Sequence, residues 1–217
     1  MTHDPRPTLE YRTVQPVVGS APHPAIVLLH GRGSNELDLL SLGHQLDPRL
    51  LVISPRAPNA FAPGSYYWYD LEAAMIGQPS AEDLQHSLDL VDSLVEDALS
   101  TMPIDPARLF VGGLSMGGAM TAAMLLMHAE RLAGAMILSG YVPVHSDLPW
   151  RPERAVGKPV FQAHGLYDDI LPLQFGRMSR DYLQRIPVEL TYREYPMAHQ
   201  VSTAELTDGA IWIRDLI

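Results

Sequence analysis

Short apolar runs alternate along the chain with segments of helical periodicity. The apolar runs end at glycine, proline or polar residues, as expected for strands that are buried on both faces of a sheet. They lie at 25–29, 50–53, 108–111, 135–138, 159–163 and 188–195, and a weakly alternating segment at 8–15 is expected at a sheet edge. Helices are predicted at 36–46, 80–102, 118–128, 173–186 and after 202. This order predicts a mostly parallel sheet with helices on both faces.

The segment 56–79 follows neither pattern. It is rich in proline and contains the aromatic cluster Tyr-Tyr-Trp-Tyr at 66–69. The segment is too long for a simple connector, so we predict a functional loop or a lid. The chain has no internal repeat and no dividing linker, and 217 residues are few for two domains. Residues 1–217 are therefore predicted to form a single domain.

The composition is that of an ordinary globular protein, with 47% hydrophobic and 18% charged residues. A net charge of -10 opposes binding to nucleic acid and to anionic membrane surfaces. No apolar run approaches the roughly 20 residues of a membrane helix. The polar start lacks the apolar segment of a signal peptide. We therefore expect a cytoplasmic protein without stable membrane insertion.

Two residue types are absent or nearly absent, which excludes several kinds of chemistry. The chain has no cysteine, so disulfides, thiolate nucleophiles and cysteine-bound metals are excluded. The chain has one lysine, Lys158. A phosphate-binding loop with this lysine would need a glycine at position 152, which is Pro152. No spacing of histidines and acids supports a metal site either.

Residues 113–117 read Gly-Leu-Ser-Met-Gly, between a predicted strand and a predicted helix. This pattern is typical of a nucleophile elbow, in which a sharp turn projects the serine from the sheet edge. Gly113 and Gly117 supply the space that the turn needs. The Met116 N–H, at the start of the helix, points to where an oxyanion would form. The alternative is that Ser115 only caps the helix.

A serine hydroxyl needs a base that is itself held by an acid. In an elbow-bearing fold of this kind, the partners follow the nucleophile in the order acid, then histidine. Among the downstream histidines, His145 and His164 precede any suitable acid, which leaves His199 as the base. Asp168 and Asp169 both follow a predicted strand, and spacing does not choose between them. The alternatives are solvated turn aspartates and an ordinary loop histidine.

A second oxyanion donor in such sites comes from the loop after an early strand. Here that loop reads His-Gly-Arg-Gly-Ser at 30–34. Its two glycines let the backbone turn and leave the Arg32 N–H free to point into the site. We therefore predict that the Arg32 and Met116 amides form an oxyanion hole.

These motifs together resemble the carboxylesterase/phospholipase family of small α/β-hydrolases, which includes the acyl-protein thioesterases. The matching segments occur in the family's order at 30–33, 68–70, 113–117, 164–168 with Pro172, and His199. The resemblance implies an α/β-hydrolase fold without a large cap domain. It also implies hydrolysis of carboxylic esters or acyl thioesters without a cofactor, and association as a homodimer. It assigns the acid to Asp168 and the backbone oxyanion donors to Arg32 and Met116.

Three positions depart from the family pattern. The residue at Arg32 is usually apolar, the one at Ser34 is commonly acidic, and the one at Met116 is often glutamine. The backbone donors survive these changes. The Arg32 side chain leaves two hypotheses open: it recognises an anionic part of the substrate, or it lies in solvent.

The aromatic cluster and the apolar residues after it are candidates for an acyl pocket, because apolar walls suit an acyl chain. The candidates are Trp68, Tyr69, Met75 and Ile76. Alternatively, these side chains pin the long segment to the rest of the protein, a role that suits Trp68 best. His30 and His164 are expected to hold loops through hydrogen bonds.

The sequence therefore predicts a serine hydrolase that forms an acyl-enzyme on Ser115 with a Ser-His-Asp triad. The expected substrate is a small-molecule or acyl ester. Two alternatives stay open: another α/β-hydrolase reaction such as lactone hydrolysis, and a non-catalytic binding protein on the same fold.

Overall fold

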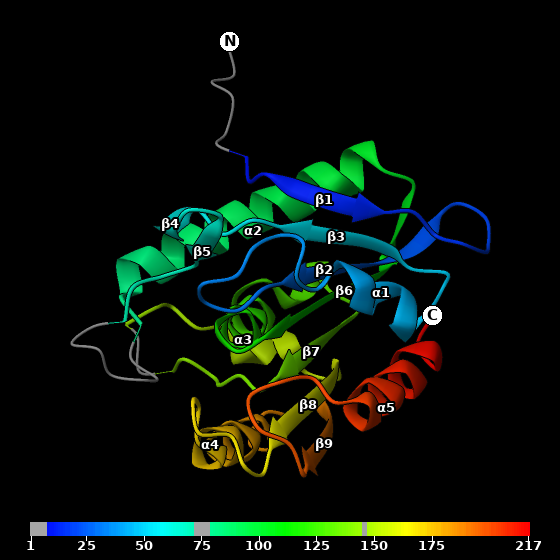
Figure 1. The fold of residues 1–217 in the computed structure, drawn as a ribbon. Coiled ribbons are helices and arrows are strands. Elements are labelled where there is room, and N and C mark those ends of the chain that lie inside the picture. The colour runs from blue at the N-terminus through cyan, green and yellow to red at the C-terminus, as the bar shows by residue number, and fades with distance from the viewer. Residues whose placement is uncertain (1–7, 72–78, 145–146) are drawn as a thin grey trace.

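A seven-stranded sheet forms the centre of the protein (Figure 1). The computed structural model describes residues 8–71, 79–144 and 147–217. The strands of the sheet are β1 (Tyr11–Val14), β2 (His23–Leu29), β3 (Leu51–Pro55), β6 (Ile104–Leu114), β7 (Gly134–Leu138), β8 (Pro159–Gly165) and β9 (Glu189–Tyr195). Their order across the sheet is β1, β3, β2, β6, β7, β8, β9. Strand β1 pairs antiparallel with β3 at one edge, and the other neighbouring pairs are parallel. The predicted mostly parallel sheet is confirmed.

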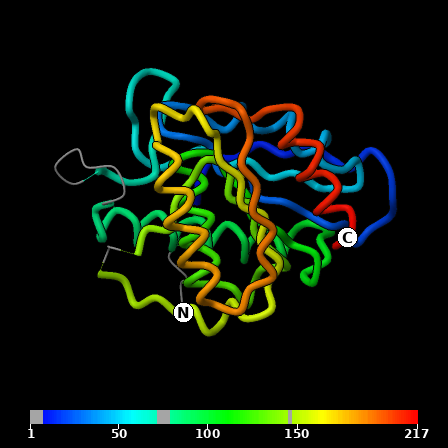
Figure 2. The backbone as a smooth tube through the Cα atoms, turned by 90° about the horizontal axis from the view of Figure 1, so that it is seen from below, coloured from blue at the N-terminus to red at the C-terminus, as the bar shows by residue number. Residues whose placement is uncertain are grey.

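Helices cover both faces of the sheet. They are α1 (Leu40–Leu46), α2 (Ala81–Thr101), α3 (Met116–His128), α4 (Leu173–Leu183) and α5 (Thr203–Arg214), with the short 3-10 helices η2 (Ala129–Arg131) and η3 (Pro152–Ala155). Helices α2, α3 and α4 pack on one face, and α1 and α5 pack on the other. In Figure 2 the red α5 and the green α2 lie on opposite sides of the sheet.

Successive side chains of strand β2 point to opposite faces of the sheet, and each face has its own hydrophobic core between the strands and the helices. Val27 and Leu29 pack with α2 and α3, whereas Ile26 and Leu28 pack on the side of α1 and α5. All four side chains are at most 2% exposed. Burying each one contributes about 1.5–3 kcal/mol. A strand buried on both faces therefore has the continuous apolar run seen in the sequence.

Helix α2 begins where the sequence predicts. The Ser80 hydroxyl accepts a hydrogen bond from the Asp83 N–H at 3.4 Å and caps the helix. Asp83 and Glu82 place negative charge in the first turn, where the helix dipole favours it. Leu84 and Leu88, four residues apart, are fully buried on the core-facing side.

The bounds of several elements differ from the prediction by a few residues, and two segments show why such differences arise. The helix expected at 36–46 begins only at Leu40, because the Asn35 side chain accepts a hydrogen bond from the Leu37 N–H at 3.0 Å and forms a turn instead. The segment 56–79 has no clear period in the sequence, yet it contains a hairpin of β4 (Asn59–Ala62) and β5 (Ser65–Tyr67). Gly64 in the connecting turn has a φ of +76°, which favours glycine.

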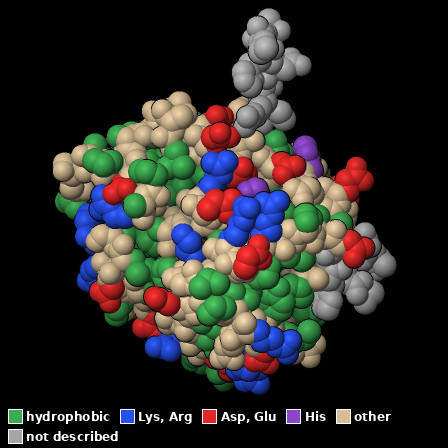
Figure 3. All heavy atoms as spheres, turned by 180° about the vertical axis from the view of Figure 1, so that it is seen from behind, with side chains coloured by type: hydrophobic (Ala, Val, Ile, Leu, Met, Phe, Trp, Pro, Cys, Tyr) green, Lys and Arg blue, Asp and Glu red, His purple; other side chains and the backbone are tan. Residues whose placement is uncertain are grey.

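The surface carries both signs of charge. Figure 3 shows one face on which acidic and basic side chains are interspersed. Ion pairs of the protein include Arg177 with Glu194 at 2.8 Å and Arg108 with Asp105 at 2.7 Å. Within the described ranges, no helix is long and apolar enough to cross a membrane.

Candidate active site

Ser115 lies at the sharp turn between β6 and α3. Its φ of +59° is in the left-handed region, which costs about 1–3 kcal/mol for a residue with a side chain. The Ser115 N–H donates to the Leu138 carbonyl at 2.9 Å and fixes the turn to β7. A Cβ added at Gly113 would collide with the Gly117 carbonyl, and one at Gly117 would collide with the Leu29 carbonyl. The two glycines are therefore required by close backbone packing, as the motif predicts.

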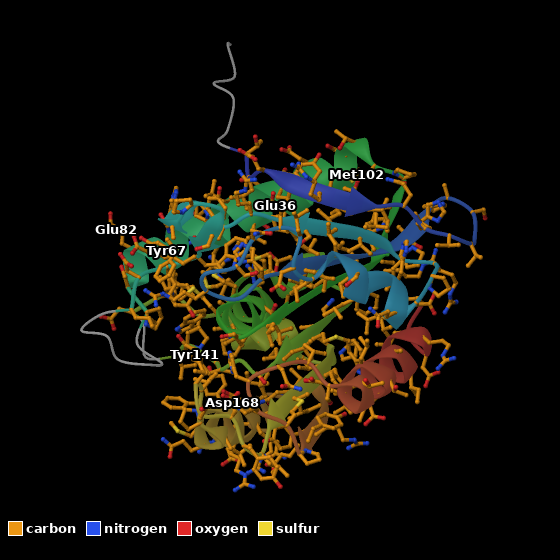
Figure 4. The ribbon with its side chains drawn as sticks, in the orientation of Figure 1. Glu36, Tyr67, Glu82, Met102, Tyr141 and Asp168 are labelled. Atoms are coloured by element: carbon orange, nitrogen blue, oxygen red, sulfur yellow. The ribbon has the colours of Figure 1, made fainter. Side chains whose placement is uncertain are left out.

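The carboxyl ends of β6, β7, β8 and β9 meet at one edge of the sheet, because these strands are parallel neighbours. Ser115 follows β6, Asp168 follows β8 and His199 follows β9. Figure 4 shows Asp168 at this edge together with Tyr141, which follows β7. Chain segments far apart in the sequence are thus brought to one place.

Asp168 is held by three hydrogen bonds. Its Oδ1 accepts from the N–H groups of Ile170 at 3.1 Å and Leu171 at 2.8 Å. Its Oδ2 lies 2.7 Å from the Nδ1 of His199. The Asp168 side chain is fully buried, whereas Asp169 is exposed. Of the two aspartates that the spacing left open, the structure therefore pairs Asp168 with the histidine.

His199 lies on the short segment between β9 and α5. The Met197 carbonyl in this segment accepts a hydrogen bond from the Tyr167 N–H at 3.0 Å, which ties it to the loop of Asp168. The His199 side chain is 16% exposed. Within residues 8–71, 79–144 and 147–217, the Ser115 hydroxyl makes no hydrogen bond to this imidazole. Such contacts are often long until substrate binds.

A cavity of about 230 Å³ opens beside Ser115. The described residues in its wall are Arg32, Tyr69, Leu71, Ser115, Met116, Tyr141, Ile170 and Leu171. In the described part of the chain, the Arg32 and Met116 N–H groups donate no hydrogen bond to another protein group. Met116 is the first residue of α3, so its N–H has no acceptor within the helix. Both amides are therefore available to an oxygen atom in the cavity.

The Arg32 side chain lies at the rim of this cavity. Its guanidinium carbon is 4.6 Å from the centre of the Phe61 ring in β4. Both side chains are exposed, and among the described residues the guanidinium has no acidic partner. The cation is held by an aromatic face and remains open to solvent.

The predicted pocket residues have different positions. Tyr69 forms part of the cavity wall, and its hydroxyl is 3.0 Å from that of Tyr141. Trp68 is fully buried outside the wall, and its Nε1–H donates to the His30 carbonyl at 2.9 Å. Met75 and Ile76 lie outside the described residues, as does His145.

Sequence reasoning missed Leu71, Tyr141, Ile170 and Leu171 in the cavity wall. Tyr141 carried a usable signal, because it follows a predicted strand at the same edge as Ser115. Ile170 and Leu171 had a weaker signal, since they directly follow the candidate acids. Leu71 had none beyond its place next to the aromatic cluster.

His30 and His164 hold loops, as predicted. The His30 Nδ1 donates to the Gly31 carbonyl at 2.8 Å, and its Nε2 accepts from the Ala57 N–H at 3.1 Å. The His164 Nε2 donates to the Leu171 carbonyl at 2.8 Å. Burial lowers the pKa of both imidazoles, which favours the neutral form. The His30 bonds require this form, because Nε2 accepts from Ala57. In the described ranges, no cluster of three or more potential metal ligands exists.

Comparison with protein families places the chain in one of them. The model of the phospholipase/carboxylesterase family matches residues 13–217. The chain belongs to this family. Acyl-protein thioesterase 1 of Emericella nidulans is 29% identical, with 84% of this chain and 86% of that protein aligned. The enzyme of the same name from Debaryomyces hansenii is 28% identical, with coverages of 76% and 75%.

Solved structures confirm the α/β-hydrolase fold. A carboxylesterase from Bacillus cereus superposes with a TM-score of 0.85 over 98% of this chain and 96% of that chain, at 23% identity. The names of relatives in this family state different activities. A rice protein that is 28% identical, with 69% of this chain and 63% of that protein aligned, is named a probable inactive carboxylesterase. Membership alone therefore does not assign a reaction.

Proposed function

We propose that this protein is a serine hydrolase that cleaves carboxylic esters or acyl thioesters through an acyl-enzyme on Ser115. The observation that carries the proposal is the hydrogen-bonded pair of Asp168 and His199 at the sheet edge where the strained Ser115 turn lies. A binding protein has no need of a buried aspartate held against an imidazole next to a strained serine. The proposed reaction uses no metal and no cofactor.

In the first half of the reaction, His199 acts as the base. Its Nδ1–H donates to Asp168 at 2.7 Å, which leaves Nε2 of the neutral ring free to accept the Ser115 proton. Ser115 Oγ then attacks the carbonyl carbon of the ester. The Arg32 and Met116 amides stabilise the oxyanion, and Asp168 stabilises the imidazolium.

In the second half, His199 gives its proton to the departing alcohol or thiol, and the acyl group stays on Ser115. A water molecule then attacks this ester while His199 again accepts a proton. Collapse of the second tetrahedral intermediate releases the carboxylic acid and restores the Ser115 hydroxyl. The acyl group would occupy the cavity beside Ser115, whose Leu71, Ile170 and Leu171 side chains suit an apolar chain.

The names of the relatives support both substrate classes, because they include acyl-protein thioesterases and carboxylesterases. The deciding experiment is hydrolysis of a chain-length series of simple esters and the matching thioesters, with Ser115→Ala as the control. We expect hydrolysis by wild type and only background by Ser115→Ala. Equal rates for the two proteins would exclude the proposal and leave the binding-protein alternative. Adding lactones to the panel tests the other enzymatic alternative, which a preference for lactones would favour.

A further inference from the structure

Glu205 is a buried carboxyl group that the mechanism above does not use. It lies in the first turn of α5 and is 1% exposed. Its Oε2 accepts a hydrogen bond from the Ser202 N–H at 3.3 Å, and its own N–H donates to Ser202 Oγ at 3.2 Å. Its Oε1 has no hydrogen-bond partner among the described residues. Buried side-chain oxygens are normally paired, so this exception needs an explanation.

Glu205 lines a small cavity between the sheet and helices α1 and α5. The other side chains of the wall are apolar, and they include Leu28 of β2, Leu46 of α1, Met136 and Leu138 of β7, and Val201. Strand β6 contributes Gly113, two residues before Ser115. Among the described residues, the wall has no second titratable or charged group.

Outside the cavity, Tyr195 is close enough to feel a charge on Glu205. Tyr195 of β9 donates to Asp208 of α5 at 2.7 Å. Burial, this hydrogen bond and the charges of Asp208 and Glu205 all raise the pKa of the Tyr195 hydroxyl. The pair offers Glu205 no positive charge.

The surroundings therefore favour the neutral carboxylic acid. Burial raises the pKa of Glu205 to about 8, against the opposing effect of the Ser202 hydrogen bond. Ionisation would leave an unpaired charge among apolar side chains, which is strongly unfavourable. The charge can reach water only if the side chain moves away from this position, and that movement breaks the hydrogen bond from the Ser202 N–H to Oε2.

Ser202 lies three residues after His199. Two residues before His199, the Met197 carbonyl is bonded to the Tyr167 N–H of the loop that carries Asp168. The imidazole thus sits on a short segment with two fixed ends. The Asp168 loop holds one end. Ser202 holds the other: its N–H donates to Glu205 Oε2, and its Oγ and carbonyl accept from the Glu205 and Leu206 N–H groups of α5.

We propose that Glu205 is a positioning residue for His199. Its neutral carboxyl group, buried beside the cavity, fixes residues 197–202 through Ser202, and its ionisation loosens this segment and slows acylation of Ser115. The inference rests on the proposed function, because it assigns a role to the position of the base.

The test is the pH profile of kcat and KM for a simple ester, measured on wild type and three variants. Glu205→Gln keeps an oxygen that can accept from Ser202 but cannot ionise. Glu205→Leu removes the acceptor and keeps a side chain of similar size beside the cavity. Glu189→Gln makes the same replacement at an exposed position of β9 and serves as the matched control. Ser115→Ala gives the background at each pH, and thermal unfolding at each pH verifies that the proteins are folded.

We expect the kcat of wild type and of Glu189→Gln to fall above about pH 8, by up to about tenfold per pH unit. Glu205→Gln should keep the neutral-pH kcat and lose this alkaline fall. Glu205→Leu should lower kcat at neutral pH by about tenfold or more with little change in KM, because a misplaced base slows chemistry and not binding.

An identical alkaline fall in wild type and Glu205→Gln would overturn the inference, as would global unfolding of wild type over the same pH range. If Glu205→Leu is folded and has an unchanged kcat, Glu205 is only structural and the inference is also wrong. Each of these results leaves hydrolysis dependent on Ser115. Loss of the proposed function itself would instead appear as activity that survives in Ser115→Ala.

Discussion

Asp168 and Glu205 are two buried acids on either side of His199, and their surroundings differ sharply. Asp168 accepts hydrogen bonds from two backbone amides and one imidazole. Glu205 accepts from one amide and otherwise faces apolar side chains. Both lose water on folding, but only Asp168 receives enough donors to stabilise a negative charge. Burial alone therefore does not decide what a carboxyl group can do. The donors around it decide.

The largest effect is expected from removing the charge of Asp168. Asp168→Asn keeps the size of the side chain but cannot hold the imidazole in the required tautomer, so kcat should fall about 10³- to 10⁴-fold. Asp169→Asn, at the exposed neighbouring position, is the matched control and should retain activity. Steady-state ester hydrolysis measures both. If Asp168→Asn kept a large part of the wild-type kcat, the assignment of the acid would be wrong.

The second-largest effect is the pH dependence of the free energy of unfolding that Glu205 causes. The folded protein holds the Glu205 proton up to about pH 8, whereas the unfolded chain releases it near the ordinary value of 4.5. The folded state therefore binds more protons between these pH values, and the free energy of unfolding of wild type falls as pH rises. Relative to wild type, Glu205→Gln should gain up to about 1.4 kcal/mol per pH unit across this window.

Denaturant unfolding of both proteins at pH 5, 6, 7 and 8 measures this difference. A stability difference that does not change with pH would show that Glu205 is ionised in the folded protein. The comparison between the two buried acids would then fail.

A third buried acid sharpens the comparison because it has a cationic partner. Glu36 forms two hydrogen bonds with Arg56 at 2.7 and 2.8 Å, and these lower its pKa to about 2. A lowered pKa stabilises the fold above the unfolded value of about 4.5, and the gain is lost as pH falls toward 2. Glu36→Gln should therefore cost about 1–3 kcal/mol at pH 7, after allowance for the partly exposed Arg56.

The difference between Glu36→Gln and wild type should shrink on acidification, which is the opposite of the trend expected for Glu205→Gln. Thermal unfolding between pH 3 and pH 7 measures it. The same pH trend in both variants would contradict the account of the two sites.

The smallest effect is expected at the exposed cation of the cavity rim. The Arg32 guanidinium has no acidic partner among the described residues, so it can attract an anionic substrate group, but water screens the attraction. Arg32→Leu should reduce the preference for anionic over neutral esters by no more than about fivefold, corresponding to about 1 kcal/mol. Arg185→Leu, at an exposed position, controls for net charge. An unchanged preference would favour the alternative of a solvated side chain.

The sequence predicted the sheet, most helices and the Ser115 turn because each depends on local rules. Apolar runs fix the strands, and the glycines at 113 and 117 are required by the turn itself. The order of the chain was enough to select His199. The choice of Asp168 needed the family pattern, because it depends on the Ile170 and Leu171 amides and on a histidine 31 residues away.

Other features depend on packing that no local pattern reports. Tyr141 and Ile170 enter the cavity wall from irregular segments, so neither has a periodicity to detect. At Glu205 the spacing Ser-x-x-Glu from residue 202 signals a helix cap, and such caps are usually exposed. Its burial results from the contact of α1 with α5 across the sheet face.

The central claim is that Ser115 is the nucleophile activated by His199 and Asp168. The most direct test is covalent labelling with a fluorophosphonate, followed by mass spectrometry of the intact protein and of its peptides. We expect one adduct per wild-type chain, located on Ser115, no adduct on Ser115→Ala and strongly slowed labelling of His199→Ala. Equal labelling of wild type and Ser115→Ala, or an adduct on a different residue, would contradict the account.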